Sequence, residues 1–138
     1  MFTKAVPDLK LRFLWLSIGY ALVALVVFLS LSSSPVDLEL DVPYQDKFFH
    51  GIAYFTLMAW FSQIYHDKFQ RNMIAVVFVF MGVTLEYLQS FAPDRYSEFA
   101  DIVANLTGVA LGFAIASTGA KNILLGVEKV FANLIKQT

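Results

Sequence analysis

The chain has 138 residues, of which 58% are hydrophobic and only 15% are charged. Soluble domains are nearer half apolar and a quarter charged, and a domain this small buries too little surface to hide such an excess. The net charge of −1 and the lack of a basic patch interleaved with aromatic residues argue against nucleic-acid binding. Because there is no cysteine, disulfides, thiolate catalysis and cysteine-ligated metals are excluded. The composition predicts a single membrane domain over residues 1–138.

The first apolar run, residues 13–34, follows a basic N-terminal segment and contains no charged residue. A helix of about 20 residues is long enough to cross a bilayer core of about 30 Å. We therefore predict a membrane span that ends before Pro35, because proline does not continue a helix. A cleaved signal peptide is the alternative, since three serines precede the proline, but the apolar core of a signal has only about 7–15 residues.

Three further spans are predicted at residues 46–65, 73–90 and 101–120, and with the first they form an all-α bundle of four transmembrane helices. The second span has aromatic residues toward both ends, as expected where a helix meets the two membrane boundaries. The third carries a polar stripe that includes Glu86 and Gln89, which lie three residues apart on one helix face.

Small residues recur at every fourth position of the last predicted span, which favours close approach of another helix. They are Ala100, Ala104, Gly108, Gly112, Ala116 and Ala120. Such a stripe indicates packing rather than chemistry, and it serves equally well within one chain or between two copies. A homo-oligomer formed through this stripe is therefore an open alternative, beside the lipid bilayer as a partner.

Residues 121–136 follow a different pattern and are too polar to span a membrane. Their apolar side chains fall on one helical face, while their lysines lie off that face. An amphipathic helix of this kind lies along a membrane surface. The apolar residues are Ile123, Leu124, Val127, Val130, Phe131, Leu134 and Ile135, and the lysines are Lys121, Lys129 and Lys136.

Basic residues are distributed unevenly over the segments outside the predicted spans. Eight of the ten lie in the N-terminal segment, the middle turn and the C-terminal tail, which four spans place on one side. The positive-inside rule makes that side cytoplasmic. We therefore predict a multi-pass protein of the bacterial cytoplasmic membrane with both termini inside. The eight are Lys4, Lys10, Arg12, Lys68, Arg71, Lys121, Lys129 and Lys136.

This orientation brings the polar residues of three spans to one level near the outer membrane surface. The second span begins there with Asp46, Lys47 and His50. The third ends there with Glu86, and the fourth begins there with Asp101. Ionisable groups at such positions are costly unless they are paired or functional, so we predict a polar site that faces outward.

The same residues carry a resemblance to a known family. In chain order the pieces are Asp46-Lys47-xx-His50-xxx-Tyr54, Glu86-xx-Gln89, Pro93-x-Arg95 and Asp101-xxx-Asn105-xx-Gly108-xxx-Gly112. Together they resemble the signature of the VanZ-like family, whose namesake is associated with resistance to the glycopeptide antibiotic teicoplanin. One departure is Asp94, where the family pattern leads us to expect glycine; it leaves the geometry and charge of this loop open.

His50, Glu86 and Asp101 are the candidate catalytic residues. An imidazole has an ordinary pKa of about 6.5, which suits a general base or a proton carrier. Two alternatives stay open for His50: a core histidine that only bonds Glu86 or Asp101, and a divalent metal site formed by all three side chains. Asp101 also has an ordinary interpretation as the N-cap of its helix. No other cofactor is predicted.

The preferred hypothesis is a site that binds or processes an anionic envelope component, such as a lipid-linked wall precursor or a phospholipid head group; the antibiotic itself is another candidate ligand. Lys47 and Arg95 would attract the anion. Whether the protein is an enzyme is left undecided, because no activated nucleophile stands out. The alternative is a non-catalytic envelope helper or regulator whose polar groups only lock the bundle. The other residues predicted to line the site are Asp46, Tyr54, Gln89 and Asn105.

Overall fold

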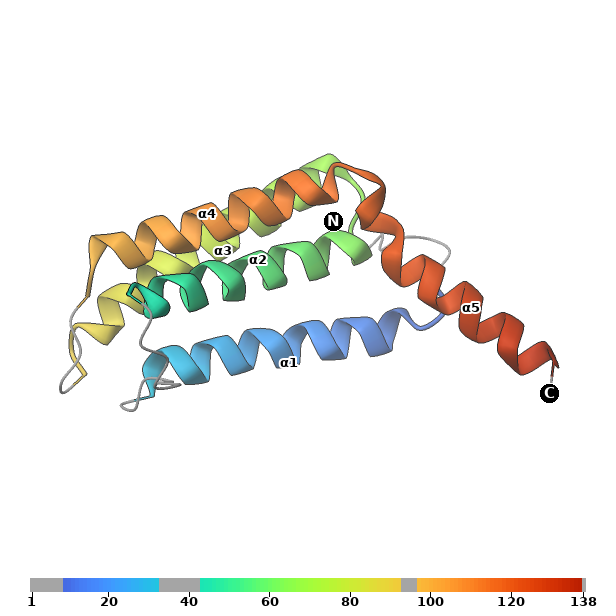
Figure 1. Cartoon of the computed structure of the whole chain (residues 1–138), viewed down its shortest axis with the longest axis horizontal. Helices are drawn as coiled ribbons and strands as arrows, with labels where there is room; N and C mark the ends of the chain where they lie inside the picture. Colours follow the sequence, from blue (N-terminus) through green and yellow to red (C-terminus); the bar gives the residue numbers. More distant parts are fainter. Residues whose placement is uncertain (1–8, 33–42, 93–96, 138) are drawn as a thin grey trace.

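The computed structural model describes residues 9–32, 43–92 and 97–137, and among these it contains helices and no strand. The helices α1 to α4 lie side by side along the length of the molecule, and α5 extends from one end (Figure 1). The predicted all-α fold is confirmed. In chain order the elements are α1 (Arg12–Leu31), α2 (Gln45–Ile64), α3 (Lys68–Gln89), α4 (Phe99–Ala116), the 3₁₀ helix η1 (Gly119–Asn122) and α5 (Ile123–Gln137).

The helix ends differ from the predicted bounds where local capping decides them. The helix α3 begins at Lys68 rather than at residue 73, because the side chain of Asp67 accepts a hydrogen bond of 3.0 Å from the N–H of Gln70. The helix α4 ends at Ala116 rather than at residue 120. There the Thr118 hydroxyl accepts a hydrogen bond from a backbone N–H of η1, which turns the chain toward α5.

Three of the described helices, α1, α3 and α4, are long and apolar enough to cross a membrane. The prediction of four spans is wrong in this respect, because α2 is not among them. The physical reason is the position of α2, which contacts α1, α3, α4 and α5. A helix enclosed in this way places polar side chains against protein rather than against lipid, so it does not need an apolar composition.

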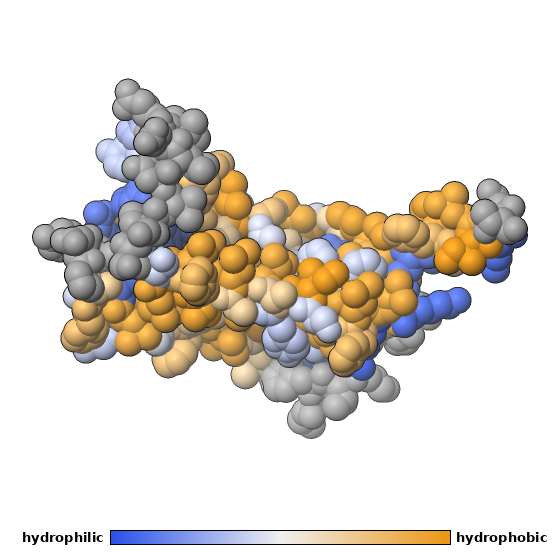
Figure 2. Space-filling view, turned by 90° about the horizontal axis from the view of Figure 1, so that it is seen from below, coloured by the Kyte–Doolittle hydropathy of each residue, from blue (hydrophilic) through white to orange (hydrophobic). Residues whose placement is uncertain are grey.

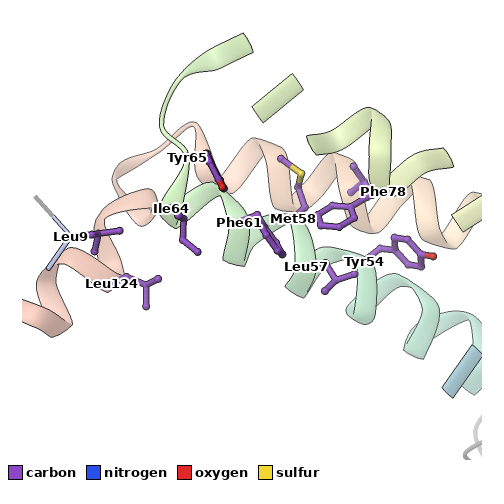
Figure 3. Packing of buried hydrophobic residues seen from close by; sticks show 10 residues of the cluster. Leu9, Tyr54, Leu57, Met58, Phe61, Ile64, Tyr65, Phe78 and Leu124 are labelled. Carbon is purple, nitrogen blue, oxygen red and sulfur yellow. The ribbon is translucent and has the colours of Figure 1, made fainter. Parts of the chain in front are cut away.

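The apolar core is built around α2 (Figure 3). Aromatic rings meet edge to face across the helices: Phe61 of α2 lies 5.6 Å from Phe78 of α3 and 5.7 Å from Tyr20 of α1 between ring centroids. Such pairs add to the free energy gained by burying the rings themselves. The buried members on α2 are Tyr54, Leu57, Met58, Phe61, Ile64 and, at its end, Tyr65.

Large apolar side chains also cover the outside of the bundle. Phe13 on α1 is 85% exposed and Phe80 on α3 is 72% exposed. Figure 2 shows apolar residues along most of one face of the molecule. In water a patch of this extent would drive association, whereas lipid chains are as apolar as the side chains they would contact. The surface of the helices therefore suits contact with a bilayer.

Two glycines of the small-residue stripe let α4 lie directly on α2 of the same chain. A Cβ atom on Gly108 would overlap the carbonyl oxygen of Gly51, and one on Gly112 would lie 2.8 Å from the carbonyl oxygen of Phe55. These positions are therefore used within the chain. The prediction of a homo-oligomer through the stripe can no longer rest on them.

Candidate functional site

The start of α2, the end of α3 and the start of α4 lie at the end of the bundle away from α5 (Figure 1). Side chains from these three helices converge there. Ligand-type atoms of His50 on α2, Glu86 on α3 and Asp101 on α4 all lie within 4.8 Å of one another. Glu86 is only 1% exposed and Asp101 only 6%. We call these three residues, with Lys47 and Asn105, the polar cluster. The structure brings the predicted catalytic candidates together, while their catalytic role stays a prediction.

His50 connects α2 to both neighbouring helices. Its Nδ1 lies 3.1 Å from Oδ1 of Asn105 and 3.5 Å from Oε1 of Glu86. A proton on Nδ1 would therefore be donated to the amide oxygen of Asn105, with the Glu86 carboxylate beside it. A core histidine was expected to bond Glu86 or Asp101. Glu86 is near the imidazole, and Asn105 is a partner that the sequence did not predict.

Lys47 binds three carboxylates at once. Its Nζ lies 2.6 Å from Asp46, 2.7 Å from Glu98 and 3.1 Å from Asp101. An ammonium group has three N–H donors, so these oxygens can take all of them. The ion pairs bridge α2 and the start of α4. Lys47 is therefore already ion-paired, and its role in attracting an anion stays a prediction.

Asp101 does not cap its helix. The N-cap position of α4 is Glu98, and the backbone N–H of Asp101 donates a 3.0 Å hydrogen bond to the carbonyl oxygen of Glu98. The N-cap interpretation is therefore wrong. Asp101 instead lies in the first turn, where a negative charge is stabilised by the helix dipole, and its side chain faces Lys47 and the other groups of the polar cluster.

Tyr54 adjoins the polar cluster from the apolar side. A Cβ atom on Gly82 of α3 would lie 3.3 Å from Cζ of Tyr54 and 3.3 Å from Nδ2 of Asn105, so this glycine leaves room for both side chains. The Tyr54 hydroxyl is buried and has no hydrogen-bond partner among the described residues. Figure 3 shows that the hydroxyl points away from the apolar core.

One described residue that was predicted to line the site, Gln89, does not join the polar cluster. The amide of Gln89 donates a 2.8 Å hydrogen bond to the carbonyl oxygen of Ser30, which ties α3 to the end of α1. Arg95 lies outside the described residues, as do Pro93, Asp94 and the acidic segment before α2.

An apolar groove of about 310 Å³ lies between α2 and α4 and reaches the polar cluster. Its floor is made by glycines, which bring the two backbones close and leave no side chain between them. Because Lys47 lines the groove, one end of it is charged and the rest is apolar. The lining residues are Lys47, Phe48, Gly51, Ile52, Phe55, Ala104, Thr107, Gly108 and Leu111.

Sequence reasoning missed a second polar arrangement at the opposite end of the bundle. The carboxylate of Glu128 on α5 accepts hydrogen bonds of 2.8, 2.8 and 2.7 Å from the backbone N–H groups of Lys10 and Leu11 and from the indole of Trp15. Burial alone would raise the pKa of Glu128, but these hydrogen bonds outweigh it and hold the pKa below its usual value. The sequence contained a signal for this arrangement. Glu128 lies four residues after the apolar Leu124 and so shares its helix face, which predicts that Glu128 faces the bundle as well.

Apolar helices around a buried polar cluster define an integral membrane domain of the helical-bundle class. A family model described as VanZ/LLP1 matches residues 10–124. The chain therefore belongs to the VanZ/LLP1 family, which confirms the resemblance noted in the sequence.

The chain is also similar to a protein of Schizosaccharomyces pombe that is described as uncharacterised. The two are 32% identical over 97 residues. The aligned part covers 68% of this chain and 58% of the yeast protein, so the likeness extends over little more than half of that relative. No solved structure matches the chain.

Proposed function

We propose that the protein binds a membrane lipid or a lipid-linked envelope component. The polar head of the ligand would lie at the polar cluster, and one hydrocarbon chain would occupy the groove between α2 and α4. The observation that carries this proposal is the place of Lys47, which lines the groove and is ion-paired with Asp101. A ligand with a polar end and an apolar length fits a polar site that continues into an apolar groove.

The charge of the site restricts the head group. The carboxylates of Asp46, Glu98 and Asp101 surround the Lys47 ammonium. The Glu86 carboxylate lies beside His50, so these described groups together carry a net negative charge. An anionic head group, such as a phosphate, therefore needs a further cation to bind here. Arg95 is one candidate, and a bound metal ion is another.

A similar protein occurs in a yeast. We therefore propose a head group that many membranes share, such as a phosphodiester. In a bacterium the same chemistry extends to a lipid-linked wall precursor, which would connect the site to the teicoplanin resistance associated with the VanZ namesake.

The proposed orientation places the polar cluster at the outer face of the membrane. The described basic residues of the α1 start, the α2–α3 turn and the α4–α5 segment gather at the opposite end, which we assign to the cytoplasm. In this orientation α5 lies along the inner membrane surface, with exposed side chains such as Val130 and Ile135 directed into the lipid.

Native mass spectrometry of the protein released from nanodiscs containing phosphatidylglycerol tests this proposal. We expect one lipid to stay bound to the wild-type protein and to be lost from Thr107→Phe, which fills the groove. Val103→Phe is the matched control, because Val103 is exposed on α4 one turn away and does not line the groove. Equal lipid retention by all three proteins would contradict the proposal.

A structural role is the second candidate, because the polar cluster also cross-links the bundle. Lys47 joins α2 to α4, and His50 joins α2 to both α3 and α4. If bracing is the only role, His50→Ala lowers the melting temperature and leaves the bound lipid unchanged. Loss of lipid from a His50→Ala protein of nearly unchanged melting temperature would favour the binding site.

A further inference from the structure

The side chains of His50, Glu86 and Asp101 are arranged as a set of metal ligands. They come from three different helices, and one ligand atom of each lies within 4.8 Å of the other two. Metal–ligand bonds of about 2.0–2.2 Å place two donors at most about 4.4 Å apart. Small side-chain rotations therefore suffice to bring all three donors onto one ion.

Burial and charge make this set attractive to a cation. The carboxylates of Glu86 and Asp101 are almost completely buried in an apolar bundle, where a nearby positive charge stabilises a negative one most strongly. The ammonium of Lys47 is shared between Asp101 and two exposed carboxylates. A divalent ion would bring the whole site close to neutrality.

The Tyr54 hydroxyl is a second and independent observation. Tyr54 is only 1% exposed, and its hydroxyl has no hydrogen-bond partner among the described residues. The ring carbon that carries it and the amide nitrogen of Asn105 would each lie 3.3 Å from a Cβ atom on Gly82, so Tyr54 and Asn105 border the same space. A buried hydroxyl in this position can bond to a ligand carboxylate or to a water molecule on the ion, which gives the missing partner.

The neighbouring acidic group of Asp46, Glu98 and Asp101 has the same spacing, but it does not offer a metal site. The ammonium of Lys47 already lies among these three carboxylates, at 2.6, 2.7 and 3.1 Å. A metal ion there would have to displace a bound positive charge. The two sites therefore differ in kind, and only the one that includes the His50 imidazole is left for a metal.

We propose that His50, Glu86 and Asp101 bind one divalent cation. One imidazole nitrogen with two carboxylates suits an ion of intermediate hardness, such as Mn²⁺ or Zn²⁺. The inference deepens the proposed function and rests on the same site, because the ion would supply the positive charge that an anionic head group needs.

Titration of the chelator-treated protein with Mn²⁺, followed by electron paramagnetic resonance, tests the inference in detergent. We expect one Mn²⁺ per chain in the wild-type protein and at least 100-fold weaker binding in both His50→Gln and Glu86→Gln. Glu98→Gln is the matched control; it removes a carboxylate of the acidic group around Lys47 and should bind Mn²⁺ as the wild type does. The melting temperature of the wild type should rise with Mn²⁺ concentration, which gives a readout that needs no variant.

The outcomes separate this inference from the proposed function. Absence of stoichiometric Mn²⁺ binding in the wild type, or Mn²⁺ binding that depends on Glu98 and not on Glu86, overturns the metal site. Lipid retention that is sensitive to Thr107→Phe would then still support the lipid site. The reverse result, with Mn²⁺ bound through His50 and Glu86 and no lipid retained, leaves the metal site and removes the lipid function.

Discussion

The carboxylate of Glu128 accepts hydrogen bonds from the backbone N–H groups of Lys10 and Leu11, which stand immediately before α1. The first N–H groups of a helix have no partner inside it, and the helix dipole makes this end positive. The Glu128 carboxylate of α5 therefore accepts hydrogen bonds from these N–H donors, and its negative charge is stabilised by the positive end of the helix dipole. The indole of Trp15 donates a third bond, so a single side chain holds α5 to the beginning of the bundle.

Glu128 should make the stability of the protein depend on pH. Because its pKa is lowered in the folded protein, its contribution is complete above the unfolded pKa of about 4.3 and is lost as the pH falls through the folded value. Thermal unfolding in detergent should therefore show that stability falls less between pH 7 and pH 3 in Glu128→Gln than in the wild type. At pH 7 the variant should be less stable by about 1.5–3 kcal/mol, the range for hydrogen bonds to a charged group.

Lys129→Gln is the control for this experiment, because Lys129 is the exposed neighbour of Glu128 on α5. It should retain the pH dependence of the wild type. Parallel curves for the wild type and Glu128→Gln would show that the carboxylate contributes nothing through its charge.

At the residue level, the sequence predicts which groups meet better than it predicts how they pair. Helix order and direction are enough to place His50, Glu86 and Asp101 at one depth, and the structure finds them together. The partners of Lys47 depend on helix rotation and on side-chain rotamers, which hydrophobic patterns do not encode. The ion pair between Lys47 and Glu98 is therefore seen only in the structure.

Among the helix pairs, the closeness of α2 and α4 depends on Gly108. A Cβ atom there would overlap the backbone of Gly51, which is part of a helix and cannot move alone. Gly108→Ala should therefore push the helices apart and destabilise the protein by about 1–3 kcal/mol, as overpacking does in well-packed interiors. Thermal unfolding in detergent measures this change.

Gly126→Ala is the matched control for Gly108→Ala. Gly126 lies in α5 with no atom within 4 Å of a Cβ placed on it, so alanine meets no obstacle there. Alanine is favoured over glycine inside a helix by about 0.8–1 kcal/mol, so this substitution should leave stability unchanged or raise it. If both substitutions changed stability alike, close contact at Gly108 would not be the reason for its effect.

Element bounds were predictable where the signal is hydrophobic length and not where it is capping. The helix α1 starts within one residue of the predicted span, because its apolar run is clear. The start of α3 depends instead on Asp67, whose capping bond extends the helix into the polar turn. The end of α4 depends on Thr118 in the same way, and neither cap alters the hydrophobic pattern.

For the molecule as a whole, the number of candidate spans was the part that composition could not decide. The helix α2 is as long as α1, yet only α1 is apolar enough to count as a span. The polar residues of α2 are tolerated because three other helices and α5 surround it. Hydropathy assumes that each segment meets lipid by itself, so it misjudges a helix that meets mainly protein.

The proposed orientation leads to a prediction about the two ends of the bundle. Ser97 lies exposed just before α4, at the end that holds the polar cluster, and Asn122 lies exposed at the other end, in η1. Because the chain has no cysteine, single cysteines can be introduced at these positions without background. In intact cells a membrane-impermeant maleimide should label Ser97→Cys and should label Asn122→Cys only after the membrane is opened.

Both variants should react in detergent, which shows that each thiol is accessible. The reverse pattern in cells would place the basic end outside, and the polar cluster could then not meet ligands of the outer face.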